Sequence, residues 1–197
     1  MTKLEGVNLI LQSVGQRPFT ALQTGSASLA GDAERYLDTF NREVQMQGWA
    51  CNRRTQEITT SLVVADYKYA APTGTLAIDP TDKSKKWVLL NGYLFDTEEN
   101  TDVFAQNETV EVDLLVLIDF DKLPPTLAEA IARAAAFDFL VNIIKQFSGT
   151  MYANVRDRAA ASMARAKNSD IDQTDVNVLD EPGIRDIKGD RNSNRWR

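Results

Sequence analysis

The sequence predicts an α+β protein: a four-helix bundle with an inserted antiparallel β lobe and an extended C-terminal arm. Apolar residues recur at helical spacing on both sides of a middle third that is rich in β-branched and aromatic residues separated by turn residues. After Asn168 apolar residues become sparse. We therefore expect the bundle over residues 1–52 and 121–168, the β lobe over 53–120 and the arm over 169–197.

Two amphipathic helices are expected at the start of the chain. In the first, apolar residues recur at helical spacing: Leu4, Val7, Leu11 and Val14. This helix is expected to end at Gly15, ahead of Pro18. Ser28 is placed to cap the second helix, which is expected to run to about Gln47 because Gly48 suits the left-handed residue that commonly follows a helix.

The pattern changes to that of strands from about Asn52. Four segments have strand composition: residues 57–64, 74–78, 86–96 and 108–120. Within the third segment, Asn91 and Gly92 predict a two-residue hairpin turn, because both of its central positions require positive φ.

Helical spacing resumes after Pro124 and Pro125. Residues 126–147 are apolar around most of the helix circumference, so we expect this to be the central and most buried helix. Gly149 is expected to end it, and a fourth helix is expected over residues 151–167.

The C-terminal arm has two parts of opposite charge. Residues 170–181 carry five carboxylates and neither Lys nor Arg, whereas residues 184–197 are basic. Both parts contain too few apolar residues to fold alone. Two interpretations remain open: the arm is a solvated tail, or it folds onto a partner.

The composition excludes several kinds of chemistry. The chain has no histidine, which removes the usual general base and the commonest metal ligand. Its one cysteine, Cys51, is expected to be a small buried apolar residue. A net charge of -6 argues against tight binding of nucleic acid. We therefore expect no enzyme activity, no metal site and no cofactor.

The bulk composition predicts a single folded unit. Hydrophobic residues make up 43% of the chain and charged residues 25%, which is enough apolar material for a core. There is no run of eighteen apolar residues and no charged-then-apolar leader, so neither a membrane span nor a secretory signal is expected.

Carboxylates are dense in the expected β lobe and leave an enzymatic alternative open. They are Asp79, Asp82, Asp96, Glu98, Glu99, Asp102, Glu108, Glu111 and Asp113. Two of them at a separation of roughly 5–10 Å would suit a glycosidase. Ordinary surface acidity is the favoured interpretation. The run from Asp96 to Asn100 lacks the central glycine and terminal glutamate of a calcium-binding loop.

The corner formed by Gly48 and Trp49 also has two interpretations. A tryptophan just beyond a helix end usually packs back over the last turn, and this is the favoured interpretation. The alternative is an exposed contact for a partner.

The N-terminal segments resemble tail tubular protein A, the head-to-tail adaptor family of short-tailed phages. The resemblance rests on residues 7–18, a helix ending in a turn with Gly15 and Pro18, and on residues 34–52, a helix ending at Gly48 and Trp49 with Asn52 after it. The later segment 123–139 matches the place where the family resumes its helical bundle after the β insertion.

This resemblance implies a virion structural protein with no catalytic step. Twelve copies would form a ring between the portal and the tail nozzle, assembled in the host cytoplasm and anchoring fibres or spikes. The genome would pass through the ring without specific binding. Ordinary solubility is the favoured interpretation of the acidic balance, and the alternative is that acidic side chains face the bore and keep DNA from adhering.

The resemblance also implies that the arm reaches along the portal. The candidate contact residues are Ile184, Arg185, Ile187, Lys188, Arg191, Arg195 and Trp196. Two alternatives are a carbohydrate-active or sugar-binding tail protein that uses carboxylates of the β lobe, and a cytosolic protein-binding module.

Overall fold

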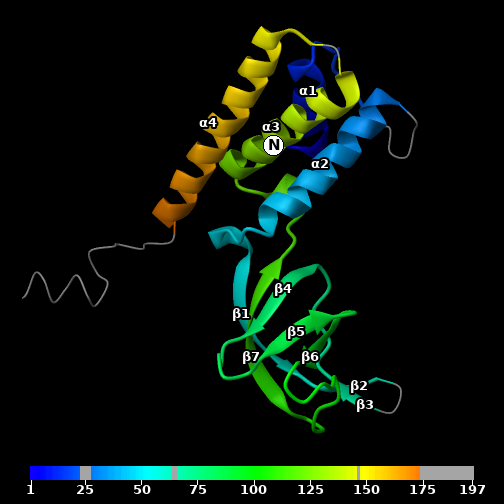
Figure 1. Ribbon diagram of the computed structural model, residues 1–197, viewed down its shortest axis with the longest axis vertical. Helices are drawn as coiled ribbons and strands as arrows, with labels where there is room; N and C mark the ends of the chain where they lie inside the picture. Colours follow the sequence, from blue (N-terminus) through cyan, green and yellow to red (C-terminus); the bar gives the residue numbers. More distant parts are fainter. Residues whose placement is uncertain (23–27, 64–65, 146, 174–197) are drawn as a thin grey trace, which may run out of the picture.

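The computed structural model describes residues 1–22, 28–63, 66–145 and 147–173. A helical part lies at one end of the molecule and a β lobe at the other (Figure 1). The helices are α1 (Lys3–Ser13), α2 (Leu29–Gln45), α3 (Pro125–Phe139) and α4 (Gly149–Gln173). The lobe is inserted between α2 and α3, so the chain crosses the junction between the two parts twice.

Local sequence signals fix the ends of α1 and α2. The Thr2 hydroxyl accepts a hydrogen bond from the Glu5 amide, and the Glu5 carboxylate accepts one from the Thr2 amide, which forms a capping box. The hydroxyl of Ser28 caps α2, as predicted. Gly15 and Gly48 follow the two helices with φ of 77° and 78°, which confirms both predicted helix stops.

Helix α3 is the centre of the helical part, as predicted. It packs against α1, α2 and α4. Fully buried alanines along it, such as Ala128, Ala132 and Ala135, let the neighbouring helices approach closely. The expected helix over 126–147 ends earlier, because a π-helical turn over Leu140–Ile144 follows Phe139 and Lys145 adopts a left-handed φ of 58°.

Helix α4 is longer than the sequence predicted. It continues to Gln173, so residues 169–173 are helical and do not belong to the arm. The carboxylate of Asp170 accepts a hydrogen bond from the Ala50 amide at 2.8 Å and holds the last turns of α4 against the junction. The rest of the expected arm, 174–197, including all seven candidate portal-contacting residues, lies outside the described residues.

One continuous hydrophobic core serves the helical part. It includes buried residues from each helix: Ile10, Leu37, Ile131 and Val155. Because the four helices share this core, we propose that the helical part is a four-helix bundle.

The β lobe contains a three-stranded antiparallel sheet in the order β1-β7-β4 and two hairpins. The strands are β1 (Arg53–Thr59), β2 (Ser61–Val63), β3 (Asp66–Lys68), β4 (Thr75–Pro80), β5 (Trp87–Leu90), β6 (Tyr93–Asp96) and β7 (Thr109–Val116). Hairpin β5-β6 turns at Asn91 and Gly92, whose φ values of 51° and 84° confirm the predicted turn. An isolated bridge from Ala70 to Tyr93 links the two hairpins.

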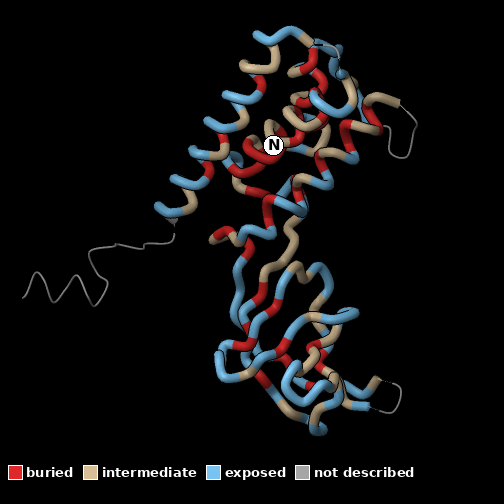
Figure 2. The backbone as a smooth tube through the Cα atoms, viewed as in Figure 1, coloured by how far each residue is buried: buried red, intermediate tan, exposed pale blue. Residues whose placement is uncertain are grey.

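The lobe has its own core, separate from that of the helices (Figure 2). Three aromatic rings form its centre, with ring centroids 4.8 Å apart for Tyr69 and Phe104 and 4.9 Å apart for Trp87 and Phe104. Leu94 and Val112 are fully buried beside them. The molecule therefore consists of two separately packed parts.

A buried polar network joins the two parts. The side-chain amide of Gln45 donates to the carbonyl of Ile118 and accepts from its amide, both at 2.8 Å. Asn52 donates to the Gln45 carbonyl at 2.9 Å and accepts from the Trp49 amide at 2.8 Å. Because Gln45 and Asn52 are fully buried, these bonds satisfy backbone groups that water does not reach. The network fixes the end of α2 to the segment that leaves β7.

Candidate interaction surfaces

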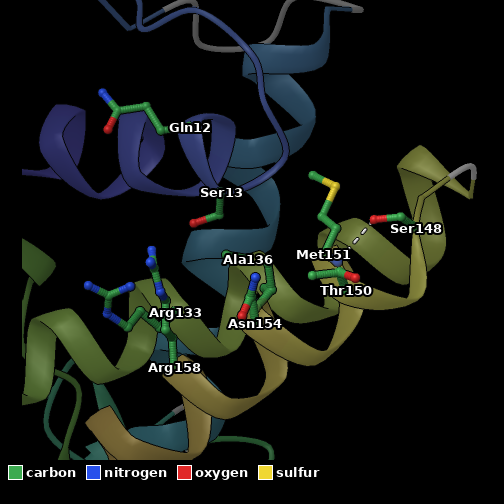
Figure 3. Close-up of a pocket in the computed structure, with 10 residues that line it drawn as sticks. Gln12, Ser13, Arg133, Ala136, Ser148, Thr150, Met151, Asn154 and Arg158 are labelled. Carbon is green, nitrogen blue, oxygen red and sulfur yellow. Dashed lines mark hydrogen bonds between the residues drawn. The ribbon is translucent and has the colours of Figure 1, made fainter.

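The first candidate surface is a groove that runs over α3 between α1 and α4. It consists of two adjoining hollows of about 370 and 630 Å³. Gln12 and Ser13 of α1, Arg133 of α3 and Arg158 of α4 line both hollows, and Ala136 and Met151 line one. Figure 3 shows Arg133 and Arg158 pointing into the space beneath α1. We call this surface the α1–α4 groove.

One end of the α1–α4 groove carries two arginines, Arg133 and Arg158, and one carboxylate, Glu5 of α1. Arg133 donates to the Glu129 carboxylate at 2.7 Å, and Arg165 lies 3.4 Å from the same oxygen. Arg158 is exposed, and no carboxylate among the residues described lies within ion-pair distance of it. Glu129 therefore serves two guanidinium groups, and Arg158 has no carboxylate partner among the residues described.

The other end of the groove combines apolar side chains with the neutral polar residues Thr150 and Asn154. Met151 is half-buried there, and Ala136 and Val155 are buried beside it. The Ser148 hydroxyl accepts from the Met151 amide at 3.1 Å and so caps the start of α4. A segment that combines apolar side chains with carboxylates would match both ends of the groove.

The second candidate surface is the solvent-facing side of the three-stranded sheet. Glu57 lies directly opposite Glu111, and Asp79 opposite Asp113, and all four side chains are exposed. Like charges in opposite positions destabilise a sheet. The nearest cation to this set is Lys83, whose ammonium lies 3.9 Å from Asp79. We call this surface the acidic sheet face.

The third candidate surface is one side of the β5-β6 hairpin. Val88 and Leu90 are 47% and 50% exposed, and they pair across the hairpin with the half-buried Phe95 and Tyr93. Two ion pairs stand at its rim, Lys68–Asp102 at 2.6 Å and Lys86–Glu98 at 2.8 Å. An apolar centre with a charged, mutually paired rim is typical of a protein–protein interface. We call this surface the apolar hairpin face.

Several of the carboxylates singled out from the sequence have structural roles within the lobe. Asp96 accepts from the amides of Glu99 and Glu98 and from the Trp87 indole, and these bonds, led by that from Glu99, hold its pKa below the usual range. The pKa of Asp82 is lowered chiefly by the hydroxyl and amide of Ser84. These two carboxylates therefore order turns of the lobe.

Predicted carboxylates line two hollows: Asp96, Glu98, Glu99 and Glu108 line one of about 390 Å³, and Asp79 and Asp113 line a second hollow. It has a volume of about 570 Å³ at the root of the lobe, and Arg53 and Arg54 also line it. A glycosidase acid must keep its proton near neutral pH, which burial commonly achieves. Because both aspartates are exposed, the hollow lacks that environment.

The residues that carry the family resemblance have structural roles. Trp49 is 4% exposed, and its indole donates to the Val44 carbonyl at 2.7 Å, so it packs back over the last turn of α2. The alternative of an exposed partner contact is wrong. Gly15 and Pro18 lie exposed in the turn after α1. A side chain at Gly48 would place Cβ 3.0 Å from the guanidinium of Arg53.

Cys51 is half-buried, so the expectation of a buried residue is wrong. It packs against the helical core and lines a small hollow together with Ala166 and Asp170 of α4. Burial, together with the charge of Asp170, raises the pKa of the thiol. A raised pKa makes the thiol a poor nucleophile at neutral pH.

Sequence reasoning missed the two arginines of the α1–α4 groove and the buried Gln45. The sequence did contain a signal for Arg133 and for Gln45. Arg133 interrupts an otherwise apolar helix segment, and Gln45 follows Val44 on the buried side of α2. Each is a polar residue on a face that periodicity assigns to the interior.

Neither a metal-binding cluster nor a candidate membrane span occurs in the described ranges. No group of three or more Cys, Asp or Glu side chains there is arranged to hold a metal ion. None of the helices in those ranges combines the length and apolar character that crossing a bilayer requires.

Comparison with known proteins identifies the family. A search of curated proteins returned no match. A family model described as tail tubular protein matches residues 4–181, a range that includes α1 from its second residue, the other three helices and the whole β lobe. The chain therefore belongs to the tail tubular protein family and is a structural component of a phage tail.

Proposed function

We propose that the protein is the adaptor ring that joins the portal to the tail nozzle, anchors fibres and forms part of the conduit for DNA ejection. The observation that carries this proposal is the presence of three chemically different surfaces on one subunit: the α1–α4 groove, the acidic sheet face and the apolar hairpin face. A subunit in a closed ring needs different faces for its two lateral neighbours and further faces for axial partners.

Each surface has a role in this proposal. The helical part supplies the lateral contacts of a twelve-membered ring. The apolar hairpin face, on the lobe, meets the nozzle or a fibre, since its apolar centre and paired rim favour a protein partner. The acidic sheet face is turned to the bore, where its four carboxylates repel the phosphates of passing DNA. Residues 184–197 contact the portal.

Electron microscopy of the purified chain mixed with the portal protein of the same phage tests the proposal. We expect closed rings, or portal particles that carry an added ring. A chain that remains monomeric and leaves the portal undecorated at micromolar concentration would contradict it.

Deleting residues 184–197 tests the axial contact separately. We expect weaker co-sedimentation with the portal while the circular dichroism spectrum stays unchanged, because the described fold ends before this segment. Attachment equal to that of the full chain would remove the arm from the proposal.

A sugar-directed function is the alternative, and the hollow that holds Asp79 and Asp113 is the observation in its favour. Release of reducing sugar from capsular polysaccharide by the purified protein, lost in Asp79→Asn and Asp113→Asn, would support it. Equal sugar release by wild type and both variants would count against these carboxylates.

A further inference from the structure

Two arginines, Arg133 and Arg158, and one carboxylate, Glu5, line the α1–α4 groove, which leaves an excess of positive charge on a subunit whose net charge is -6. Residues 149–169 of α4 carry four cationic side chains and one carboxylate. Arg158 has no ion-pair partner among the described residues, and Arg133 shares Glu129 with Arg165. Removing such charges from water is favourable only when opposite charges replace the water. The groove therefore calls for an acidic occupant.

We propose that residues 174–181 of a neighbouring copy occupy the α1–α4 groove and clasp adjacent subunits of the ring. The carboxylates of Asp180 and Glu181 pair with Arg158 and Arg133. This inference rests on the proposed ring and adds to it the segment and the groove that make the lateral contact.

Charge complementarity selects this segment. Residues 174–181 carry three carboxylates, Asp175, Asp180 and Glu181, and no cation, whereas residues 182–197 carry an excess of cations. Val178 and Leu179 directly precede Asp180 and Glu181, so the segment presents apolar side chains next to carboxylates. The groove has a matching arrangement, with the apolar side chain of Met151 at one end and the positively charged arginines at the other.

Chain length keeps Leu179 from the apolar end of its own subunit's groove. Gln173 ends α4, and at 1.5 Å per residue Met151 lies roughly 33 Å back along the helix. Leu179 is six residues beyond Gln173, and an extended chain of that length spans at most about 21 Å. Leu179 therefore cannot reach the apolar end of its own groove. A neighbouring copy has no such restriction.

The range of the family match separates this segment from the rest of the arm. The match ends at residue 181, so it includes the acidic segment and stops before the basic finish. The clasp therefore uses a segment that the family model includes, whereas the proposed portal contact uses residues beyond the match.

Charge reversal in the full-length chain tests the inference. Arg158→Glu places a carboxylate against the incoming Asp180 and Glu181, so we expect at least a tenfold rise in the dissociation constant between subunits, measured by analytical ultracentrifugation. Adding Asp180→Arg and Glu181→Arg to Arg158→Glu should restore association. Arg156→Glu is the matched control, because Arg156 pairs with Asp157 outside the groove and its reversal should leave association unchanged.

Disulfide trapping gives a second readout. In a Cys51→Ser background, Asn154→Cys and Leu179→Cys should form a disulfide between copies, seen as a ladder of covalent oligomers on non-reducing gels. A disulfide within one chain, or none in assembled rings, would overturn the inference. Equal association of wild type and Arg158→Glu would overturn it too.

Truncation separates failure of this inference from failure of the proposed function. A chain ending at residue 181 should keep lateral association and lose portal attachment, whereas a chain ending at residue 173 should lose both. Intact rings from the chain ending at 173 would contradict the clasp and leave the adaptor role standing. Absence of any ring from the full chain with the portal would contradict both.

Discussion

The helical part and the β lobe differ in the size of their cores and in the side chains that they leave exposed. The helical part places residues of all four helices in one core, and close packing around the alanines of α3 holds them together. The lobe has a smaller core centred on Tyr69 and Trp87, and it leaves an acidic face and an apolar face open to water. We infer that packing dominates the sequence of the helical part, whereas contacts with other molecules shape the surface of the lobe.

Loss of core volume should have the largest effect on the free energy of unfolding. The fraction of the molecule that is destabilised should differ between the two parts. Phe139→Ala empties a fully buried site in the helical core, for an expected loss of about 3–5 kcal/mol in the free energy of unfolding. Leu94→Ala in the lobe should cost about 2–5 kcal/mol.

Urea unfolding followed by circular dichroism at 222 nm measures both variants. Because the cores are separate, Leu94→Ala should leave most of the helical signal in a transition near that of wild type. A single transition shifted equally by both variants would show that the two parts unfold as one unit.

The junction network should have the next largest effect. Gln45→Ala leaves the amide and carbonyl of Ile118 without these bonds, for an expected loss of about 2–4 kcal/mol. Gln47→Ala is the matched control, because this exposed residue two positions further on should change stability by less than about 0.5 kcal/mol. Equal stability of the two variants would show that the network does not couple the helical part to the β lobe.

Glycine replacement at the junction should have a moderate effect. Gly48→Ala forces a side chain into a φ of 78° and against Arg53, whereas Gly15→Ala meets the same φ penalty with open space around Cβ. We expect a loss of about 1–2 kcal/mol for Gly15→Ala and a larger loss for Gly48→Ala, measured by thermal denaturation. An equal loss at both sites would show that Arg53 moves aside without cost.

The pH dependence should be the smallest effect and should separate the two parts. In the lobe the pKa of Asp96 is lowered, so its contribution is present above about pH 4 and is lost as the pH falls through the folded value. In the helical part, burial would lower the pKa of Lys3, but hydrogen bonds and charges from Asp38 and Glu34 raise it overall. Its contribution is present below about pH 10 and is lost as the pH rises further.

Asp96→Asn and Lys3→Met measure these two contributions. Asp96→Asn should flatten the loss of lobe stability at low pH, and Lys3→Met should flatten the loss of helical stability at high pH. Unfolding curves recorded from pH 3 to pH 11 for each variant check both slopes. If the slope of stability against pH is unchanged in a variant, the replaced group does not cause the pH dependence of that part.

The sequence was most informative where one local feature decides the structure. The helix stops at Gly15 and Gly48 and the turn at Asn91 and Gly92 depend on backbone angles that few residues adopt, so their positions were predicted correctly. The helical spacing of α1 to α3 was predicted for a similar reason, since each apolar stripe is visible within one segment.

Features that depend on distant residues were missed. The end of α4 was placed too early, because the acidic composition indicated an arm and the hydrogen bond from Ala50 to Asp170 joins residues 120 positions apart. The partners of Gln45 lie 73 positions away. The α1–α4 groove depends on how two helices sit on α3, which periodicity does not specify.

Hydrogen exchange on the assembled ring and on the free subunit tests the central claim most directly, namely that the helical part builds the ring while the lobe keeps its surfaces for other molecules. The account predicts slower exchange in α1 and in the first half of α4 after assembly, with β1 and β7 unchanged. Slower exchange confined to the acidic sheet face, with the α1–α4 groove unchanged, would contradict it.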